Sequence, residues 1–96
     1  GLVFSPDGKR IYLSNVNGSI KVFSVTTNGI VRPAGTWKLP GKAAPKRNNE
    51  VPAGLAVSAD GKRLYVCGSL SNKLLELDTA TGKVLRIFSV GMIPFQ

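Results

Sequence analysis

The chain has 96 residues, of which 43% are hydrophobic and 19% charged, and its formal net charge is +8. This length allows one small domain and no more, and the content of aliphatic and aromatic residues is too high for a disordered tail. Its apolar runs stay far below the ~20 residues that a membrane-spanning helix needs, so no membrane span is expected.

The start of the chain does not read as a targeting segment. Residues 1–7 contain no basic region and no long apolar region, so we expect any export signal of the parent protein to lie upstream of this segment. The single cysteine, Cys67, excludes an internal disulfide. It follows apolar residues in Leu64-Tyr65-Val66-Cys67, and we expect it to be a small buried hydrophobic residue rather than a reactive thiol.

The excess of basic residues raises the hypothesis of a nucleic-acid partner. Most of these residues are scattered singly or repeated at equivalent turns, and only Lys42, Lys46 and Arg47 cluster in one stretch. The distribution therefore favours a solvated basic surface over a phosphate-binding site, and no specific nucleic-acid partner is expected.

The chain contains an internal repeat. Residues 1–14 align with residues 54–67, and eight of these fourteen positions are identical. A second spacing, of 42 residues, separates Val51-Pro52 from Ile93-Pro94. Four-stranded propeller repeats have periods of about 40–45 residues, so the spacing predicts repeated β-units.

The first copy reads as four strands joined by turns. Residues 2–5 are an apolar run that predicts a strand buried on both faces, and Ser5-Pro6-Asp7-Gly8 predicts a turn. The expected strands then occupy residues 11–14, 19–25, 30–31 and 36–39, with turns at 17–18 and 27–29. Within 19–25, the alternation of Ile20 and Val22 with Lys21 predicts one better-buried face.

The second copy follows the same plan. Ala59 replaces Pro6, which should weaken the first turn without abolishing it. Strands are expected at residues 64–67, 73–78 and 83–90, with a turn at 79–82. No segment has a sustained helical period, so the predicted fold class is all-β.

The first repeat is longer than the second because of a polar insertion at residues 41–50. It lies between the outer strand of the first unit, residues 1–53, and the inner strand of the second, residues 54–96. Such connections lie at one rim of a propeller, where binding sites are often built. We expect the insertion to be exposed and poorly packed.

Several phrases of the chain resemble the YVTN β-propeller repeat. They are Ser5-Pro6-Asp7-Gly8-Lys9-Arg10-Ile11-Tyr12-Leu13-Ser14-Asn15, its counterpart at 55–66, Leu77-Asp78-Thr79-Ala80-Thr81-Gly82-Lys83-Val84 and Val90-Gly91-Met92-Ile93-Pro94. The resemblance implies two four-stranded antiparallel blades of a β-propeller. Because a closed ring needs at least four blades, the chain would form an incomplete ring.

A narrower resemblance lies in residues 28–41, Asn-Gly-Ile-Val-Arg-Pro-Ala-Gly-Thr-Trp-Lys-Leu-Pro-Gly. This stretch is similar to a blade of bacterial proteins that join a lactonase-like YVTN propeller to an alkaline-phosphatase-type phosphoesterase. The resemblance implies an exported parent, periplasmic or secreted, whose hydrolytic domain lies outside this segment.

Few residues in the chain could carry catalysis. The chain has no histidine, the commonest general base and nitrogen metal ligand. Asp7, Asp60 and Asp78 are expected to serve turns, and Glu76 to be solvated or paired with a basic residue. Glu50 alone has no local structural role. We therefore expect no catalytic residue, metal or cofactor within the segment.

Two classes of function remain open. The first is a non-catalytic binding or scaffold segment whose partners are the remaining blades, from the same chain or from other copies, and a protein or small anionic ligand at the rim. The second is part of an enzyme whose catalytic residues lie outside the segment. The candidate binding residues are Lys42, Lys46, Arg47, Glu50 and Trp37. In either case we do not expect an isolated compact monomer, because two blades leave two apolar faces open.

Overall fold

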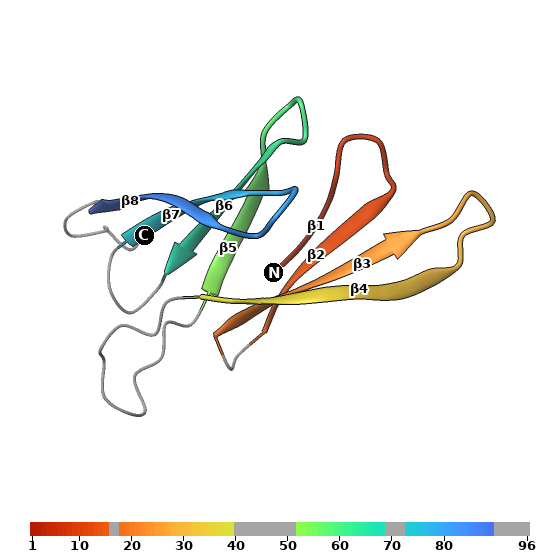
Figure 1. Ribbon diagram of the computed structural model, residues 1–96, viewed down its shortest axis with the longest axis horizontal. Helices are drawn as coiled ribbons and strands as arrows, with labels where there is room; N and C mark the ends of the chain where they lie inside the picture. The colour runs from red at the N-terminus through yellow and green to blue at the C-terminus, as the bar shows by residue number, and fades with distance from the viewer. Residues whose placement is uncertain (16–17, 40–51, 69–72, 90–96) are drawn as a thin grey trace, which may run out of the picture.

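The computed structural model describes residues 1–15, 18–39, 52–68 and 73–89, which form eight β-strands and no helix (Figure 1). The strands are β1 (Leu2–Phe4), β2 (Arg10–Asn15), β3 (Ser19–Val25), β4 (Val31–Lys38), β5 (Pro52–Val57), β6 (Arg63–Gly68), β7 (Lys73–Asp78) and β8 (Val84–Ser89). They pair in chain order as two four-stranded antiparallel sheets, β1-β2-β3-β4 and β5-β6-β7-β8, here called the first and second sheets. The all-β prediction with two four-stranded units is confirmed.

The first hairpin of each sheet closes on the predicted turn. In the first sheet, Asp7 Oδ1 accepts hydrogen bonds from the Ser5 hydroxyl at 2.7 Å and from the Lys9 amide at 2.9 Å. Gly8 has a positive φ of 74°, which glycine adopts without steric cost. The turn at residues 58–62 repeats these bonds at the same distances, with Asp60 as acceptor. Replacing Pro6 by Ala59 therefore leaves the hydrogen bonds of the turn intact.

The outer strand of the first sheet is longer than predicted. The sequence indicated two pieces, residues 30–31 and 36–39, whereas β4 runs unbroken from Val31 to Lys38. It contains Pro33, which an edge strand tolerates because no further strand needs its missing N–H. The register between β3 and β4 shifts between Val22 and Phe23, where a β-bulge accommodates the irregularity.

The hydrophobic core lies between the two sheets, with β5 packed beside β1 and β2 (Figure 1). Ile20 and Val22 are 0% and 3% exposed, whereas Lys21 between them is partly exposed, which confirms the predicted better-buried face of β3. The buried cluster consists of Tyr12, Ile20, Val22 and Leu39 from the first sheet and Leu64, Val66, Leu75 and Leu77 from the second. Each sheet thus has one covered face, which contributes to this cluster, and one open face.

Cross-strand pairing defines the two open faces. The first open face carries Leu2, Phe4, Ile11, Leu13, Lys21 and Phe23. The second open face carries Arg63, Tyr65, Cys67, Leu74, Glu76, Arg86 and Phe88.

Two burial predictions are wrong for residues on these faces. The strand at 2–5 was expected to be buried on both faces, but Leu2 and Phe4 are 56% and 53% exposed. Cys67 was expected to be buried and is only partly so. The reason is the same in both cases: each residue lies on the side of its sheet that the other sheet does not cover.

The insertion at 41–50 and residues 90–96 lie outside the described residues. Within the described ranges, no helix is long and apolar enough to cross a membrane.

Candidate functional site

Four of the five candidate binding residues, Lys42, Lys46, Arg47 and Glu50, lie outside the described residues. The structure therefore places only Trp37 on β4. Its ring centroid lies 5.7 Å from that of Tyr12, and the indole is partly buried at the border of the core. Trp37 also lies against Gly82 of the second sheet, where a Cβ atom would come within 2.4 Å of the indole ring. Trp37 thus contributes to packing between the sheets.

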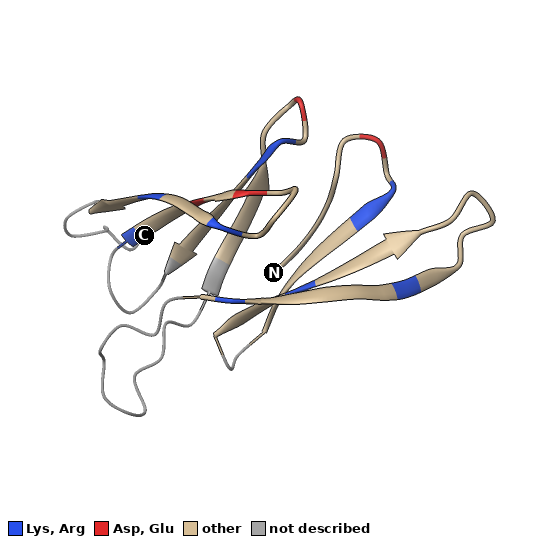
Figure 2. Ribbon diagram, viewed as in Figure 1, with Lys and Arg blue, Asp and Glu red and all other residues tan. Residues whose placement is uncertain are grey.

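A cleft of about 490 Å³ opens between the sheets at their hairpin ends. The turns β1–β2 and β5–β6 stand side by side there, each with an acidic tip followed by basic residues (Figure 2). The cleft is lined by Ser5, Pro6, Asp7, Lys9, Arg10, Tyr12, Ser24, Asp60, Gly61, Thr79 and Ala80. Its two carboxylates and two basic side chains balance in charge, so the cleft has no strong preference for anions or cations.

A hydrogen bond between two described residues crosses this cleft from sheet to sheet. Arg10 on β2 donates from Nη1 to the backbone carbonyl of Thr79 at a distance of 2.7 Å. Thr79 is itself fixed, because its hydroxyl donates to the carbonyl of Gly61 at 2.6 Å. A charged donor on a carbonyl is among the stronger hydrogen bonds in proteins. Arg10 therefore joins the first sheet to two turns of the second.

The turn carboxylates of the cleft are already engaged by their own loops. The hydrogen bond from the Ser5 hydroxyl, followed by that from the Lys9 amide, lowers the pKa of Asp7 below its ordinary value. The pKa of Asp60 is lowered in the same way, first by the Ser58 hydroxyl. These bonds confirm the predicted turn role. Asp78 also behaves as predicted, since it accepts the Ala80 amide at 3.0 Å.

The Tyr12 hydroxyl is the one polar group of the cleft lining that is deeply buried without a described partner. Tyr12 is only 1% exposed, and no hydrogen bond to its hydroxyl occurs within the described residues. The residue opposite on β3 is Val22, which offers no acceptor side chain. A buried hydroxyl without a partner is costly, so this position favours an occupant with a hydrogen-bonding group, water included.

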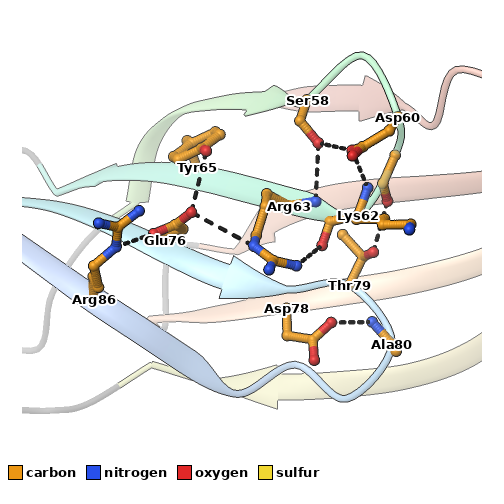
Figure 3. Close-up of polar contacts among 11 residues, drawn as sticks. Ser58, Asp60, Lys62, Arg63, Tyr65, Glu76, Asp78, Thr79, Ala80 and Arg86 are labelled. Carbon is orange, nitrogen blue, oxygen red and sulfur yellow. Dashed lines mark hydrogen bonds and ion pairs between the residues drawn. The ribbon is translucent and has the colours of Figure 1, made fainter.

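A polar cluster occupies the second open face, centred on Glu76 of β7 (Figure 3). Glu76 is 4% exposed and accepts a hydrogen bond from Arg86 Nε at 2.6 Å. It also accepts one from the Tyr65 hydroxyl at 3.2 Å, and Arg63 Nε lies 3.6 Å away. The bond from Arg86 is the main cause that holds the pKa of Glu76 below its ordinary value. The prediction that Glu76 is solvated or paired is settled in favour of pairing.

The Arg10 link was not predicted from the sequence, and for Glu76 only pairing with an unspecified basic residue was. Arg10 and Arg63 are identical positions of the repeat, and an arginine retained at both could indicate a contact that recurs between units. Glu76 stands between two leucines in a strand, and its cross-strand neighbours follow only from the register of β6, β7 and β8. Among the described residues, no group of three or more cysteine, aspartate or glutamate side chains could hold a metal.

No family model matches the chain, and no curated protein matches it. Solved structures do match. A protein from Lactobacillus plantarum superposes with a TM-score of 0.77 and 29% identity, over 93% of this chain and 27% of that protein. A periplasmic gluconolactonase from Pseudomonas aeruginosa gives 0.71 and 31%, over 95% of this chain and 26% of that enzyme.

The WD40 repeats of RRP9 give a TM-score of 0.70 and 26% identity, over 92% of this chain and 24% of that protein. The two sheets are blades of a β-propeller. The chain spans about a quarter of the length of these solved structures. A gluconolactonase and a WD40-repeat protein both occur among them, so the likeness extends to the fold and does not decide between the two classes of function.

Proposed function

We propose that this chain is a β-propeller segment that acts as a binding or scaffold module of a larger bacterial protein and has no catalytic centre of its own. The observation that carries the proposal is the state of its described carboxylates. Asp7, Asp60 and Asp78 accept hydrogen bonds from their own turns, and Glu76 is bound by Arg86 and Tyr65. Each acid therefore has a structural task.

The chemistry of these acids supports the proposal. A general base works best with a pKa near the operating pH, which for a carboxylate means a raised pKa. Hydrogen bonding instead lowers the pKa of Asp7, Asp60 and Glu76. The three are therefore poor bases at neutral pH, as expected for carboxylates that stabilise a scaffold.

The resemblance of residues 28–41 to blades of exported phosphoesterase fusions supports a periplasmic or secreted parent. In such a parent the blades position the rim of the propeller. The insertion at this rim, with Lys42, Lys46, Arg47 and Glu50, binds a protein or a small anionic ligand. The chemistry of the parent then belongs to another part of the protein.

The second candidate function is a part of a lactonase-like enzyme whose catalytic residues lie in other blades. It is favoured by the 31% identity to the periplasmic gluconolactonase over 95% of this chain. The two proposals differ in what a longer chain would do, and they agree that these two blades alone do not catalyse.

Hydrolysis assays test the proposal. The purified chain is incubated with a δ-lactone of gluconate and with a chromogenic phosphate monoester, and the expected rates equal those in buffer. Glu76→Gln serves as a matched variant, because it removes the most buried of the described carboxylates at almost constant shape. Hydrolysis above the buffer rate that disappears in Glu76→Gln would overturn the assignment as a module without catalysis.

A further inference from the structure

The interface between the two sheets shows what each open face lacks. The alignment of 1–14 with 54–67 makes Arg63 the counterpart of Arg10. Arg10 lies on a covered face and donates to Thr79 of the next sheet. Arg63 has no such sheet beside it, and its Nη1 donates to the carbonyl of its own neighbour Lys62 at 3.0 Å. The second open face thus carries the same donor as the covered one, without the acceptor.

The matching acceptor lies on the first sheet. Val25 is the counterpart of Thr79, because each amide donates to the carbonyl of the lysine in the adjacent hairpin turn, Lys9 and Lys62 respectively. Suppose that the first sheet of another copy packed on the second open face in the way that the second sheet packs on the first sheet. Its Val25 carbonyl would then face Arg63.

The apolar residues of the two open faces correspond in the same way. Leu74 on the second open face is the counterpart of Ile20, by its pairing with Cys67, and Ile20 is fully buried between the sheets. Leu74 is only partly buried. Phe4 on the first open face is the counterpart of Val57, which packs against the core. Phe4 is 53% exposed, whereas a large apolar side chain within a complete interface is mostly buried.

At two positions the open faces carry a charged residue where the covered pair has an apolar one. Glu76 on the second open face replaces Val22, and Lys21 on the first open face replaces Leu75. Val22 and Leu75 belong to the same buried cluster. Glu76 is already paired with Arg86 and Arg63 on its own face, so the correspondence between the faces lies in their hydrogen-bonding groups and apolar residues, not in their charge.

We propose that the second open face of this chain docks the first open face of a second copy, head to tail, with Arg63 donating to the Val25 carbonyl of that copy. The contact repeats the interface that already joins the two sheets within one chain. Such a heterologous contact forms a ring when its rotation closes. Three or four copies would supply six or eight blades, within the usual range for propellers. The inference rests on the proposed scaffold function and assigns the remaining blades of the propeller to other copies of this chain.

Sedimentation velocity of the purified chain over a range of concentrations tests the docking. We expect assemblies of roughly 31 or 41 kDa, three or four times the 10.2 kDa of one chain. Arg63→Ala should weaken association about tenfold or more, because it removes a charged donor from a buried carbonyl. Arg32→Ala makes the same change on an exposed part of β4. It is the control and should not weaken association. A chain that stays monomeric, or equal effects of both substitutions, would overturn the proposal.

Mixing two blocked variants tests the direction of docking. Phe4→Glu blocks the first open face, and Leu74→Glu blocks the second. Each alone should be monomeric, and an equimolar mixture should form heterodimers, since one intact face of each kind remains. Val31→Glu, at a side chain 50% exposed on the edge strand, controls for added charge and should still assemble.

Circular dichroism establishes that each variant is folded, and Leu2→Glu and Phe88→Glu replace any blocked variant that is not. A mixture that stays monomeric, or a blocked variant that assembles like the unmodified chain, contradicts head-to-tail docking. The scaffold proposal fails through hydrolysis and the docking through the absence of association, so the two failures are distinguishable.

Discussion

Tyr12 and Tyr65 occupy the same position in the two sheets, yet only Tyr65 has a hydrogen-bond partner among the described residues. The Tyr65 hydroxyl donates to Glu76 Oε2 at 3.2 Å, whereas the residue opposite Tyr12 is Val22. The residue opposite on the third strand, Glu76 or Val22, therefore decides whether the tyrosine hydroxyl has an acceptor side chain. This pair lets the value of that hydrogen bond be measured within one molecule.

Removing the two hydroxyls should have opposite effects on stability. Tyr12→Phe should leave the free energy of unfolding unchanged or raise it, because the lost group has no described partner. Tyr65→Phe should lower it by about 1 kcal/mol, the typical net value of one hydrogen bond. Urea unfolding at a fixed protein concentration measures both. A loss of more than about 1 kcal/mol in Tyr12→Phe would show that an ordered water or another group satisfies this hydroxyl in solution.

Gly82 should tolerate no side chain. Its φ is 79°, and an added Cβ would come within 2.4 Å of the Trp37 indole across the sheet interface. Gly29 has a similar φ of 82° but open space around it. Gly29→Ala should therefore cost about 1–2 kcal/mol from backbone conformation alone, and Gly82→Ala should cost clearly more. The Trp37 fluorescence spectrum should shift only in Gly82→Ala, and equal losses in both variants would refute the predicted steric clash.

Stability should fall once the pH drops below about 4. The pKa values of Asp7, Asp60 and Glu76 are lowered in the folded chain, so folding favours their ionised forms. This contribution is complete above the ordinary carboxyl pKa of about 4 and is lost as the pH falls through the folded values. Thermal unfolding between pH 7 and pH 3 should show the decline.

Glu76→Gln identifies the share of Glu76 in this acid sensitivity. The substitution removes the charge that Arg86 and Arg63 face, so the variant should be less stable at pH 7 and should lose less on acidification. Curves that run parallel for the variant and the unmodified chain would show that the cluster is not the source of the pH dependence.

Asp60→Asn should be mild, because an asparagine oxygen can accept the same two hydrogen bonds from Ser58 and Lys62. Asp60→Ala loses both and should lower the free energy of unfolding more than Asp60→Asn does. Chemical unfolding of the two variants gives the comparison. The structural role would be refuted if Asp60→Asn removed a bound metal or a measured activity while the fold stayed intact.

Deletion of residues 41–50, with Val51-Pro52 retained, should leave folding nearly intact, since the polar composition of this segment predicts few core contacts. Any binding of inorganic phosphate by the chain should be lost at the same time, because Lys42, Lys46 and Arg47 would be removed. Calorimetric titration and urea unfolding test the two effects. A large loss of stability would mean that the insertion belongs to the core.

The sequence was sufficient for the strands and turns, because their signals are local. The Ser-x-Asp-Gly-Lys-Arg phrase at 5–10 contains the donors and acceptors of its own turn, and the alternation around Lys21 predicted the buried face of β3. The unbroken β4 could not be predicted, because Pro33 is acceptable only on an edge strand, and edges are set by the pairing of the whole sheet.

Burial and the candidate site were harder to predict, because they depend on which face of a sheet meets another sheet. Phe4 and Tyr12 are both aromatic strand residues. Only the packing of β5 beside β1 and β2 leaves Phe4 exposed and buries Tyr12. Trp37 was singled out for contact with a partner, and the structure places its partly buried ring against the core between the sheets. The contact from Arg10 to Thr79 joins residues far apart in sequence, so no local pattern indicated it.

The Arg10–Thr79 hydrogen bond also has a mechanical consequence. Arg10 on β2 ties the first sheet to the turn that follows β7, at the hairpin end of the sheets. Separating the sheets at this end therefore requires breaking a charge-assisted hydrogen bond as well as exposing the buried cluster. A load that pulls the hairpin turns apart is carried by this bond and by the apolar layer together.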